Sequence, residues 1–188
     1  MKKFAAEPIK NVEDINKILS YFDSHNQLRN KLLFVIGINS GLRLSDVLAL
    51  KFQYLLNEDH SAKSRVDVHE MKTGRVSTIY INDCIAETFT EYVKTLGSID
   101  MNDLIFGNTS ANSVECMLKK VINDELGVDV HVGSHLLRKT FAYHAVLEAP
   151  DKIRAVDMIQ KMFRHKSPVT TLYYACITGE DIHNACLN

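Results

Sequence analysis

Residues 65–81, RVDVHEMKTGRVSTIYI, differ in pattern from the rest of the chain. Their two halves, RVDVHEM (65–71) and VSTIYI (76–81), alternate apolar and polar residues with the two-residue period of half-buried strands. Between them lies KTGR (72–75), and a glycine at such a position is typical of a tight turn. The stretch therefore predicts an antiparallel β-hairpin.

The residues before the hairpin have helical periodicity. Apolar residues recur at helix spacing after Asn11, a good N-cap, and a second, more apolar helix is expected over 27–40. Gly41 follows it, as a left-handed C-cap would. A short third helix is expected from Ser45, because serine caps helices well and Asp46 suits the positive end of the helix dipole.

Helical patterns return after the hairpin and continue toward the end of the chain. They cover residues 83–96, 112–126, 134–147, 151–163 and 170–175. The last ten residues, 179–188, could form a short amphipathic helix that carries Ile182 and Cys186. We therefore expect a mainly α fold with a small antiparallel β-sheet, which is an α+β class.

Length and composition are those of one globular domain. The chain has 188 residues, of which 46% are hydrophobic and 24% charged, so it can bury a core without disulfides or metals. These proportions exclude a disordered or collagen-like chain. The cysteines form no C-x-x-C pair, no apolar run approaches the ~20 residues that span a bilayer, and no signal peptide is evident. We expect a cytoplasmic protein with reduced thiols and no membrane partner.

The charge balance limits how the chain could hold a polyanion. Lysine and arginine number 22 against 23 aspartates and glutamates, so bulk charge alone would not attract one. The distribution is uneven, because residues 131–174 hold seven basic and three acidic residues, whereas 81–130 hold three basic and nine acidic. A local anion-binding face is compatible with this pattern, but on charge alone an ordinary mosaic of solvated residues explains it better.

Four segments carry residue types that could take part in chemistry, although each is weak evidence by itself. In GLRLSD (41–46), an arginine precedes a helix N-terminus, where its planar fork can meet a phosphate. The lysine of KTGR can supply a point charge or a proton. In HLLRKT (135–140), a histidine and an arginine three residues apart share one helix face. In RHKSPVTTLYY (164–174), a histidine precedes two tyrosines by eight and nine residues.

Each segment has an ordinary explanation when it is taken alone. A surface arginine, a turn lysine, a helix start capped by Ser134 and a core aromatic would account for the four in turn. A zinc site at His131 and His135 is a further alternative. Gly133 and Ser134 resemble the start of a helix, however, which would place the two histidines on different structures.

In this order and at these spacings, the four segments resemble the tyrosine recombinases, the phage integrase family. The resemblance extends from about residue 8 to residue 175 and implies the catalytic-domain fold of that family. Tyr173 falls one position short of the nucleophile's spacing from the later histidine, which leaves it as a packing residue. The catalytic residues that the resemblance implies are Arg43, Lys72, His135, Arg138, His165 and the nucleophile Tyr174.

The resemblance also implies supporting residues, with some departures from the family pattern. Asp46 stands where glutamate is commoner and would support Arg43. The family usually has glycine at the position of Arg164, and the strand after Lys72 lacks a frequent proline. Further candidates for DNA contact are Arg75, Lys139, Arg164 and Lys166.

The domain plan that follows has three parts. Residues 1–10 form a lead-in that resembles an interdomain linker, and residues 11–175 form the catalytic domain. Residues 176–188 form a tail, either mobile or docked through Ile182 and Cys186.

The implied activity is site-specific recombination of DNA through a 3′-phosphotyrosyl intermediate, with no cofactor and no metal. The partner is double-stranded DNA, bound by a monomer in free solution that assembles into a tetramer on paired sites. One alternative is a type IB topoisomerase, which shares the chemistry. Another is a non-catalytic DNA-binding module of the same fold. Loss of a catalytic residue would favour the module, and all six residue types are present.

Overall fold

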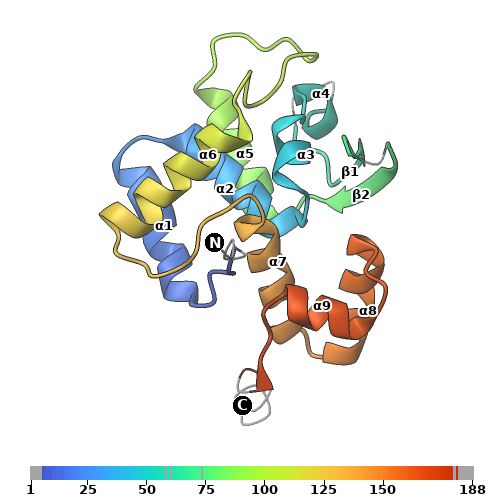
Figure 1. Ribbon diagram of the computed structural model, residues 1–188. Coiled ribbons are helices and arrows are strands. Elements are labelled where there is room, and N and C mark those ends of the chain that lie inside the picture. The colour runs from blue at the N-terminus through green and yellow to red at the C-terminus, as the bar shows by residue number, and fades with distance from the viewer. Residues whose placement is uncertain (1–5, 58, 60, 73, 180, 182–188) are drawn as a thin grey trace.

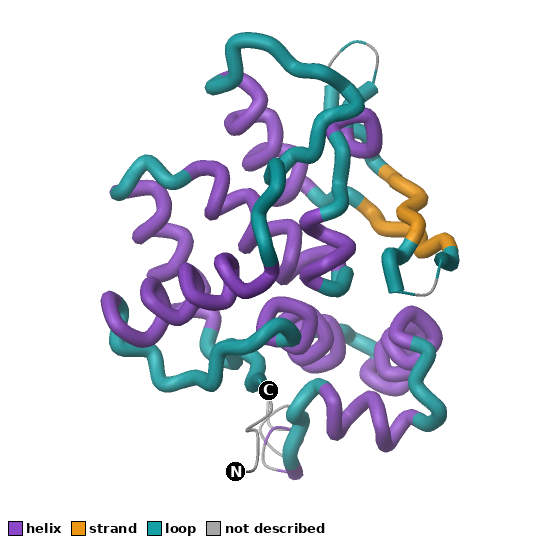
Figure 2. The backbone as a smooth tube through the Cα atoms, turned by 45° about the horizontal axis from the view of Figure 1, so that its top comes forward, coloured by secondary structure: helices purple, strands orange, loops and turns teal. Residues whose placement is uncertain are grey.

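The computed structural model describes residues 6–57, 59, 61–72, 74–179 and 181. Its elements are α1 (Val12–Ser24), α2 (Leu28–Ser40), α3 (Leu44–Leu48), α4 (Phe52–Leu55), β1 (Arg65–His69), β2 (Val76–Tyr80), α5 (Asp83–Lys94), α6 (Ala111–Lys119), the π-helix η1 (Lys120–Glu125), α7 (Leu136–Leu147), α8 (Lys152–Phe163) and α9 (Pro168–Tyr174). Helices make up most of the molecule, and the hairpin lies at one edge (Figures 1 and 2). The predicted class is confirmed.

Helix α2 forms the centre of the main core. It packs against α1, α3, α5 and α7 (Figure 1). Its buried residues are Leu32, Leu33, Phe34, Val35, Ile36, Gly37 and Ser40. A Cβ added at Gly37 would lie 2.5 Å from Cδ1 and 2.9 Å from Cβ of Leu137. The missing side chain therefore lets α2 and α7 approach closely.

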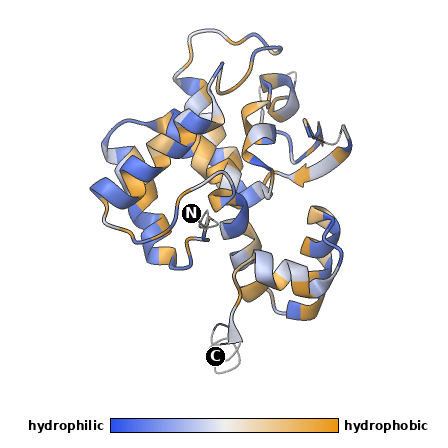
Figure 3. Cartoon of the chain, in the orientation of Figure 1, coloured by the Kyte–Doolittle hydropathy of each residue, from blue (hydrophilic) through white to orange (hydrophobic). Residues whose placement is uncertain are grey.

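The outer helices bury one face each, as their apolar spacing predicts. Helix α1 buries Ile18 and Phe22, and Figure 3 shows hydrophilic residues along its other side. Asn11 caps this helix, because its side chain accepts a hydrogen bond from the backbone N–H of Glu13 at 2.8 Å. The predicted cap is confirmed.

The first strand of the hairpin, β1, has the predicted alternation of buried and exposed residues, whereas β2 buries only Ile79 and leaves Val76 and Tyr80 exposed. β1 and β2 pair antiparallel, with Val66 opposite Ile79 and Val68 opposite Ser77. The side chains of Val66, Val68 and Ile79 are buried, whereas the residues between the two valines and on either side of them are exposed. The inward face of β1 continues beyond the strand to Glu70, whose side chain is only 5% exposed.

Helices α7, α8 and α9 enclose a smaller core beside the main one. It consists of Ala142, Val146, Ile159, Phe163 and Ala175. Helix α7 contributes to both cores, because its Leu136 and Leu137 belong to the main one. Figures 1 and 2 show α8 and α9 on the side of α7 away from α1. Helix α7 therefore joins the two parts of the molecule.

The predicted cap at Ser45 is wrong. Helix α3 begins at Leu44, and the carbonyl of its N-cap, Arg43, accepts hydrogen bonds from the N–H groups of Asp46 and Val47 at 2.9 and 3.0 Å. Ser45 is exposed within the first turn, whereas Leu44 is buried. Burial of this leucine in the core accompanies an N-cap at Arg43, two residues earlier than the capping preference of Ser45 indicates.

Other helix bounds differ from the sequence pattern. Helix α9 begins at Pro168 rather than residue 170, because Ser167 caps it and proline needs no N–H at the first position. The region 112–126 is divided into α6 and the π-helix η1. The four-residue helix α4 was not expected, since it is too short to show a helical period.

Both described ends of the chain lie against α7. In the lead-in, the Ile9 N–H donates to Thr140 Oγ1 at 3.0 Å, and the Ile9 carbonyl lies 2.8 Å from Nε2 of His144. Asp181 accepts a hydrogen bond from Tyr143 at 2.8 Å. Ile182 and Cys186, expected to dock the tail, lie outside the described residues. No helix in the described part of the chain is long and apolar enough to cross a lipid bilayer.

Gly37→Ala should destabilise the protein although alanine is the better helix former. The propensity gain is about 0.5–1 kcal/mol, whereas forcing extra volume against Leu137 costs about 1–3 kcal/mol. We expect a lower free energy of unfolding by urea denaturation. Gly97→Ala is the control, because nothing lies within 4 Å of its added Cβ, and its stability should stay equal or rise slightly. Equal stability of the two variants would contradict the close α2–α7 contact.

Candidate active site

Four separate stretches of the chain converge on one site. They are the α2–α3 loop with Arg43, the hairpin turn with Lys72, the start of α7 with His135 and Arg138, and the α8–α9 segment with His165 and Tyr174. The positive charges of Arg138, Lys139, Arg43 and Lys72 all act on the His135 ring. The fold thus brings the six predicted residues into one region.

Gly41 sets the direction in which Arg43 leaves α2. It has the predicted left-handed conformation (φ 64°), and a Cβ there would lie 2.6 Å from the ring of Phe141 and 3.0 Å from Cε of Met162. The turn brings the Arg43 guanidinium to the hairpin, where Nη1 donates a hydrogen bond to Oε2 of Glu70 at 2.7 Å.

Asp46, the predicted support for Arg43, is fully buried. Its Oδ1 accepts a hydrogen bond from the backbone N–H of Met71 at 2.9 Å, and its Oδ2 lies 3.7 Å from Nη1 of Arg43. Within the described residues, Oδ2 makes no hydrogen bond. Asp46 therefore pairs with Arg43 by charge and fastens the hairpin backbone beside it.

Arg138 is buried against an aromatic ring. The residue is 7% exposed, and its Cζ lies 3.8 Å from the centroid of the Phe163 ring. Burial lowers the pKa of Arg138, and the positive charge of Arg43 lowers it further. Because an arginine remains charged in proteins, the result is a cation held away from water and ready to bind an anion.

Tyr174, the last residue of α9, contacts His135 directly. The phenol oxygen lies 3.0 Å from Nδ1 of the histidine. Burial raises the pKa of the Tyr174 phenol, while the nearby charges of Arg138 and Arg43 lower it. Desolvation lowers the pKa of His135, and the charges of Arg138 and Lys139 lower it further. His135 is therefore neutral at pH 7 and can accept a proton.

The neighbouring tyrosine has a different environment. Tyr173 is 86% exposed, so the prediction that it is a packing residue is wrong. Successive residues of a helix point about 100° apart, and Tyr174 faces the site while Tyr173 faces solvent.

His165 lies beside Tyr174, and both rings contact Phe163 of the small core. Its Nδ1 is 3.0 Å from Oγ1 of Thr171, and its ring centroid is 5.0 Å from that of Tyr174. Burial lowers the pKa of His165, and Arg138 lowers it further. The preceding Arg164 ends α8 with a φ of 58°, in the left-handed region that favours glycine. This conformation explains the glycine of the family pattern.

The remaining predicted cations differ in exposure. Lys139 is 8% exposed, and its Nζ lies 3.4 Å from Sγ of Cys176 and 5.3 Å from the Tyr174 ring, so it lies inside the site rather than on an outer surface. Lys72, Arg75 and Lys166 are exposed.

Sequence reasoning did not include Glu70 in the site. Besides Arg43, its carboxylate accepts a hydrogen bond from the hydroxyl of Ser77 and lies 3.7 Å from Nη1 of Arg164. The signal was present, because Glu70 continues the inward series of Val66 and Val68 in the strand pattern. A charged residue on the inward face of a strand indicates a buried partner.

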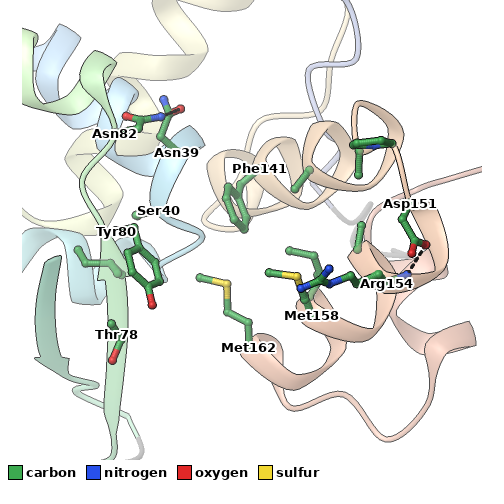
Figure 4. A pocket seen from close by; sticks show the side chains of 16 residues that line it. Asn39, Ser40, Thr78, Tyr80, Asn82, Phe141, Asp151, Arg154, Met158 and Met162 are labelled. Atoms are coloured by element: carbon green, nitrogen blue, oxygen red, sulfur yellow. Dashed lines mark hydrogen bonds between the residues drawn. The ribbon is translucent and has the colours of Figure 1, made fainter. Parts of the chain in front are cut away.

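A separate apolar groove of about 680 Å³ lies between β2, α7 and α8. Figure 4 shows Tyr80 from the strand, Phe141 from α7, and Met158 and Met162 from α8 along it. None of the six predicted catalytic residues lines this groove. Its wall meets the site indirectly, since Phe141 and Met162 also pack against Gly41.

No group of three or more histidine, cysteine, aspartate or glutamate residues could hold a metal ion within the described part of the chain. His131 lies in the loop before α7, where its carbonyl accepts a hydrogen bond from the N–H of Glu7 at 3.1 Å. His135 is the N-cap of α7. The two histidines therefore belong to different local structures.

The fold and site define a helical domain that brings together the buried Arg138, the partly buried Arg43, two histidines whose pKa values are lowered, and a tyrosine. The family model for the phage integrase family matches residues 9–180. The chain therefore belongs to the phage integrase family, the family of the tyrosine recombinases.

Similarity to individual proteins supports this assignment. Bacillus subtilis (strain 168) YoeC, described as a probable integrase/recombinase, is 28% identical over 173 residues, which are 89% of this chain and 88% of YoeC. The crystal structure of XerA recombinase matches with a TM-score of 0.74 and 18% identity, over 96% of this chain and 65% of that chain.

The XerH site-specific recombinase bound to its difH substrate, a pre-cleavage complex, matches with a TM-score of 0.67 and 21% identity. The match covers 98% of this chain and 55% of that chain. These two structural likenesses establish the tyrosine recombinase catalytic-domain fold. The chain spans between half and two thirds of the two solved proteins.

The left-handed conformation of Arg164 predicts an unusual order of stability. Arg164→Gly and Arg164→Ala both remove the guanidinium, but only alanine keeps a Cβ at φ 58°. A left-handed conformation costs a residue with a Cβ roughly 1–2 kcal/mol, partly offset by the entropy of glycine in the unfolded chain. We expect the glycine variant to be more stable than the alanine variant by about 0.5–1 kcal/mol in urea denaturation. The reverse order would contradict the backbone conformation.

Proposed function

We propose that this chain is the catalytic domain of a site-specific DNA recombinase, in which Tyr174 attacks a backbone phosphate. The observation that carries the proposal is the 3.0 Å contact between the Tyr174 phenol and Nδ1 of His135, beside the guanidinium of Arg138. A nucleophile within hydrogen-bond reach of a base, next to fixed cations, suits phosphoryl transfer.

Activation of the nucleophile begins with proton transfer. A phenol with a pKa of ~10 is mostly protonated at neutral pH, so the proton must leave as the oxygen attacks. The lowered pKa of His135 keeps this ring neutral, and a tautomer protonated at Nε2 accepts the phenol proton at Nδ1. The cations of Arg138 and Arg43 favour the phenolate that forms.

The phosphate chemistry then balances without an external energy source. The Tyr174 oxygen forms a bond to phosphorus, and the bond from phosphorus to the 5′-oxygen breaks. Arg43 and Arg138 stabilise the charge on the non-bridging oxygens, and His165 adds a donor. Lys72 gives a proton to the departing 5′-oxygen. Attack by another strand's 5′-hydroxyl reverses these steps and rejoins the DNA.

Double-stranded DNA is the proposed partner, and no cofactor takes part. The XerH neighbour was solved bound to its difH substrate, which supports a DNA-binding role for this fold. We assign catalysis to residues 11–175 and expect a monomer in solution that forms a tetramer on paired sites. With a net charge of −1, the chain alone should bind duplex DNA near the non-specific range of ~10⁻⁴–10⁻⁶ M.

Two alternatives remain in the same fold. A type IB topoisomerase would use the same residues and would relax supercoils as a monomer. A non-catalytic DNA-binding module is disfavoured, because all six residue types are present and converge.

Tyr174→Phe should abolish the covalent protein–DNA adduct. The variant keeps the ring that packs beside His165 and Phe163 and removes only the attacking oxygen, so DNA binding should change little. The measurement is adduct formation on nicked duplexes taken from the DNA that flanks the gene, followed by gel electrophoresis under denaturing conditions. Tyr173→Phe is the matched control and should form adduct normally, because Tyr173 faces solvent. Adduct in the first variant but not in the second would reverse the assignment.

Lys72→Ala should slow cleavage by about 10²–10⁴-fold, the usual contribution of a general acid. A substrate with sulfur at the 5′-bridging position has a better leaving group that needs no proton. Cleavage of this substrate by the variant should therefore approach the rate of the unmodified protein. Single-turnover rates on the two substrates provide the measurement. Equal defects on both would show that Lys72 holds the phosphate rather than donating the proton.

A further inference from the structure

Glu70 is a buried carboxylate at the centre of the cationic site, and the proposed mechanism assigns it no step. It lies two residues before Lys72, at the point where β1 enters the hairpin turn. One oxygen, Oε2, accepts a hydrogen bond from Arg43 Nη1 at 2.7 Å and lies 3.7 Å from Nη1 of Arg164. The other oxygen, Oε1, accepts a hydrogen bond from the Ser77 hydroxyl. Both oxygens are thus held by partners on three different elements.

Within the described residues, the ion pairs of Arg43 are made by one end of its guanidinium. Both carboxylates, those of Glu70 and Asp46, face Nη1, at 2.7 and 3.7 Å. Among the described residues, neither Nε nor Nη2 of Arg43 makes a hydrogen bond. Since the guanidinium is a rigid planar fork, fixing Nη1 also fixes the direction of these other donors. They are the atoms left for a phosphate.

The same two acidic residues hold the turn that carries Lys72. Asp46 accepts the N–H of Met71 at 2.9 Å. The backbone of Glu70 closes the turn, because its N–H donates to the carbonyl of Arg75 and its carbonyl accepts from Gly74, both at 2.8 Å. The lysine therefore follows directly after two residues that are tied to the arginine loop.

We propose that Glu70 is a positioning residue, which orients the Arg43 guanidinium toward the phosphate and keeps the Lys72 turn in register with it. The proposal rests on the function proposed above. In this role, Glu70 links Arg43 and Lys72, which lie on different elements and must reach the same phosphate. Glu70 acts through Arg43 and does not itself touch the DNA.

In a competing role, Glu70 would occupy the phosphate's position on Arg43 in the free protein, and DNA binding would displace Glu70 from it. The geometry favours positioning, because Glu70 shares Nη1 with Asp46, which is fully buried. A carboxylate that takes the place of the phosphate would be expected to accept hydrogen bonds from Nε and Nη2, the donors that Glu70 and Asp46 do not face. The two roles predict opposite effects of removing the carboxylate.

The first test measures adduct formation by Glu70→Ala and Glu70→Gln on the nicked duplexes. We expect about a 10²-fold slower rate for the alanine variant, the scale of a misplaced reacting group, and recovery of most of it by glutamine, which can still accept from Arg43. Asp67→Ala is the matched control: this exposed carboxylate lies on the opposite face of β1 and should leave the rate unchanged. A faster or unchanged rate in Glu70→Ala, with wild-type adduct present, would overturn positioning.

Two further measurements separate positioning from loss of folding and from failure of the proposed function. In a double-mutant cycle with Arg43→Ala, the combined loss should be well below the product of the single losses, because Glu70 acts through Arg43. Multiplicative losses would overturn the proposal. Without DNA, the nitrogen–proton resonance of Arg43 Nε should shift in Glu70→Ala and stay near its wild-type position in Asp67→Ala. An unshifted resonance would overturn positioning even if the wild-type chain formed no adduct.

Discussion

The close approach of α2 and α7 at Gly37 and Leu137 sets the geometry on which the site depends. Arg43 follows the end of α2, and His135 and Arg138 lie at the start of α7, so the packing of these two helices places the cations relative to one another. Because interiors are close-packed, a single added carbon at this contact would move one helix against the other. The contact between Gly37 and Leu137 therefore constrains both the core and the positions of the site's cations.

The site concentrates positive charge in a partly buried space, and the protein compensates for it in two ways. The carboxylates of Asp46 and Glu70 pair with Arg43, while the ring of Phe163 covers the guanidinium of Arg138. Burial lowers the pKa of His135, and the positive charges that remain lower it further. Burial raises the pKa of Tyr174, while the charges of Arg138 and Arg43 lower it and would favour a phenolate. The phosphate of the proposed substrate would offset this positive charge.

Tyr174, the proposed nucleophile, packs against the smaller core, which α7 joins to the main core. Tyr174 packs edge-on against Phe163, and α9 is held to the end of α8 by the contact of His165 with Thr171. Arg138 contacts the same Phe163 ring from α7. One aromatic side chain thus relates the tyrosine and an arginine, so the two parts of the site are aligned through packing as well as through charge.

The sequence by itself determined the features that depend on local preference: the hairpin from its two-residue period, the Asn11 cap, the Gly41 turn, and the order of the arginine, lysine, histidine and tyrosine segments. Tertiary structure alone decided the features that depend on distant neighbours. Burial of Leu44 goes with the earlier start of α3, and Tyr173 lies on the side of α9 that faces solvent. The hydrogen bond from Arg43 brings Glu70, which follows β1, into the site. Local preferences act between residues a few positions apart, whereas Glu70 and Arg43 are 27 positions apart and meet only when the hairpin packs beside α3.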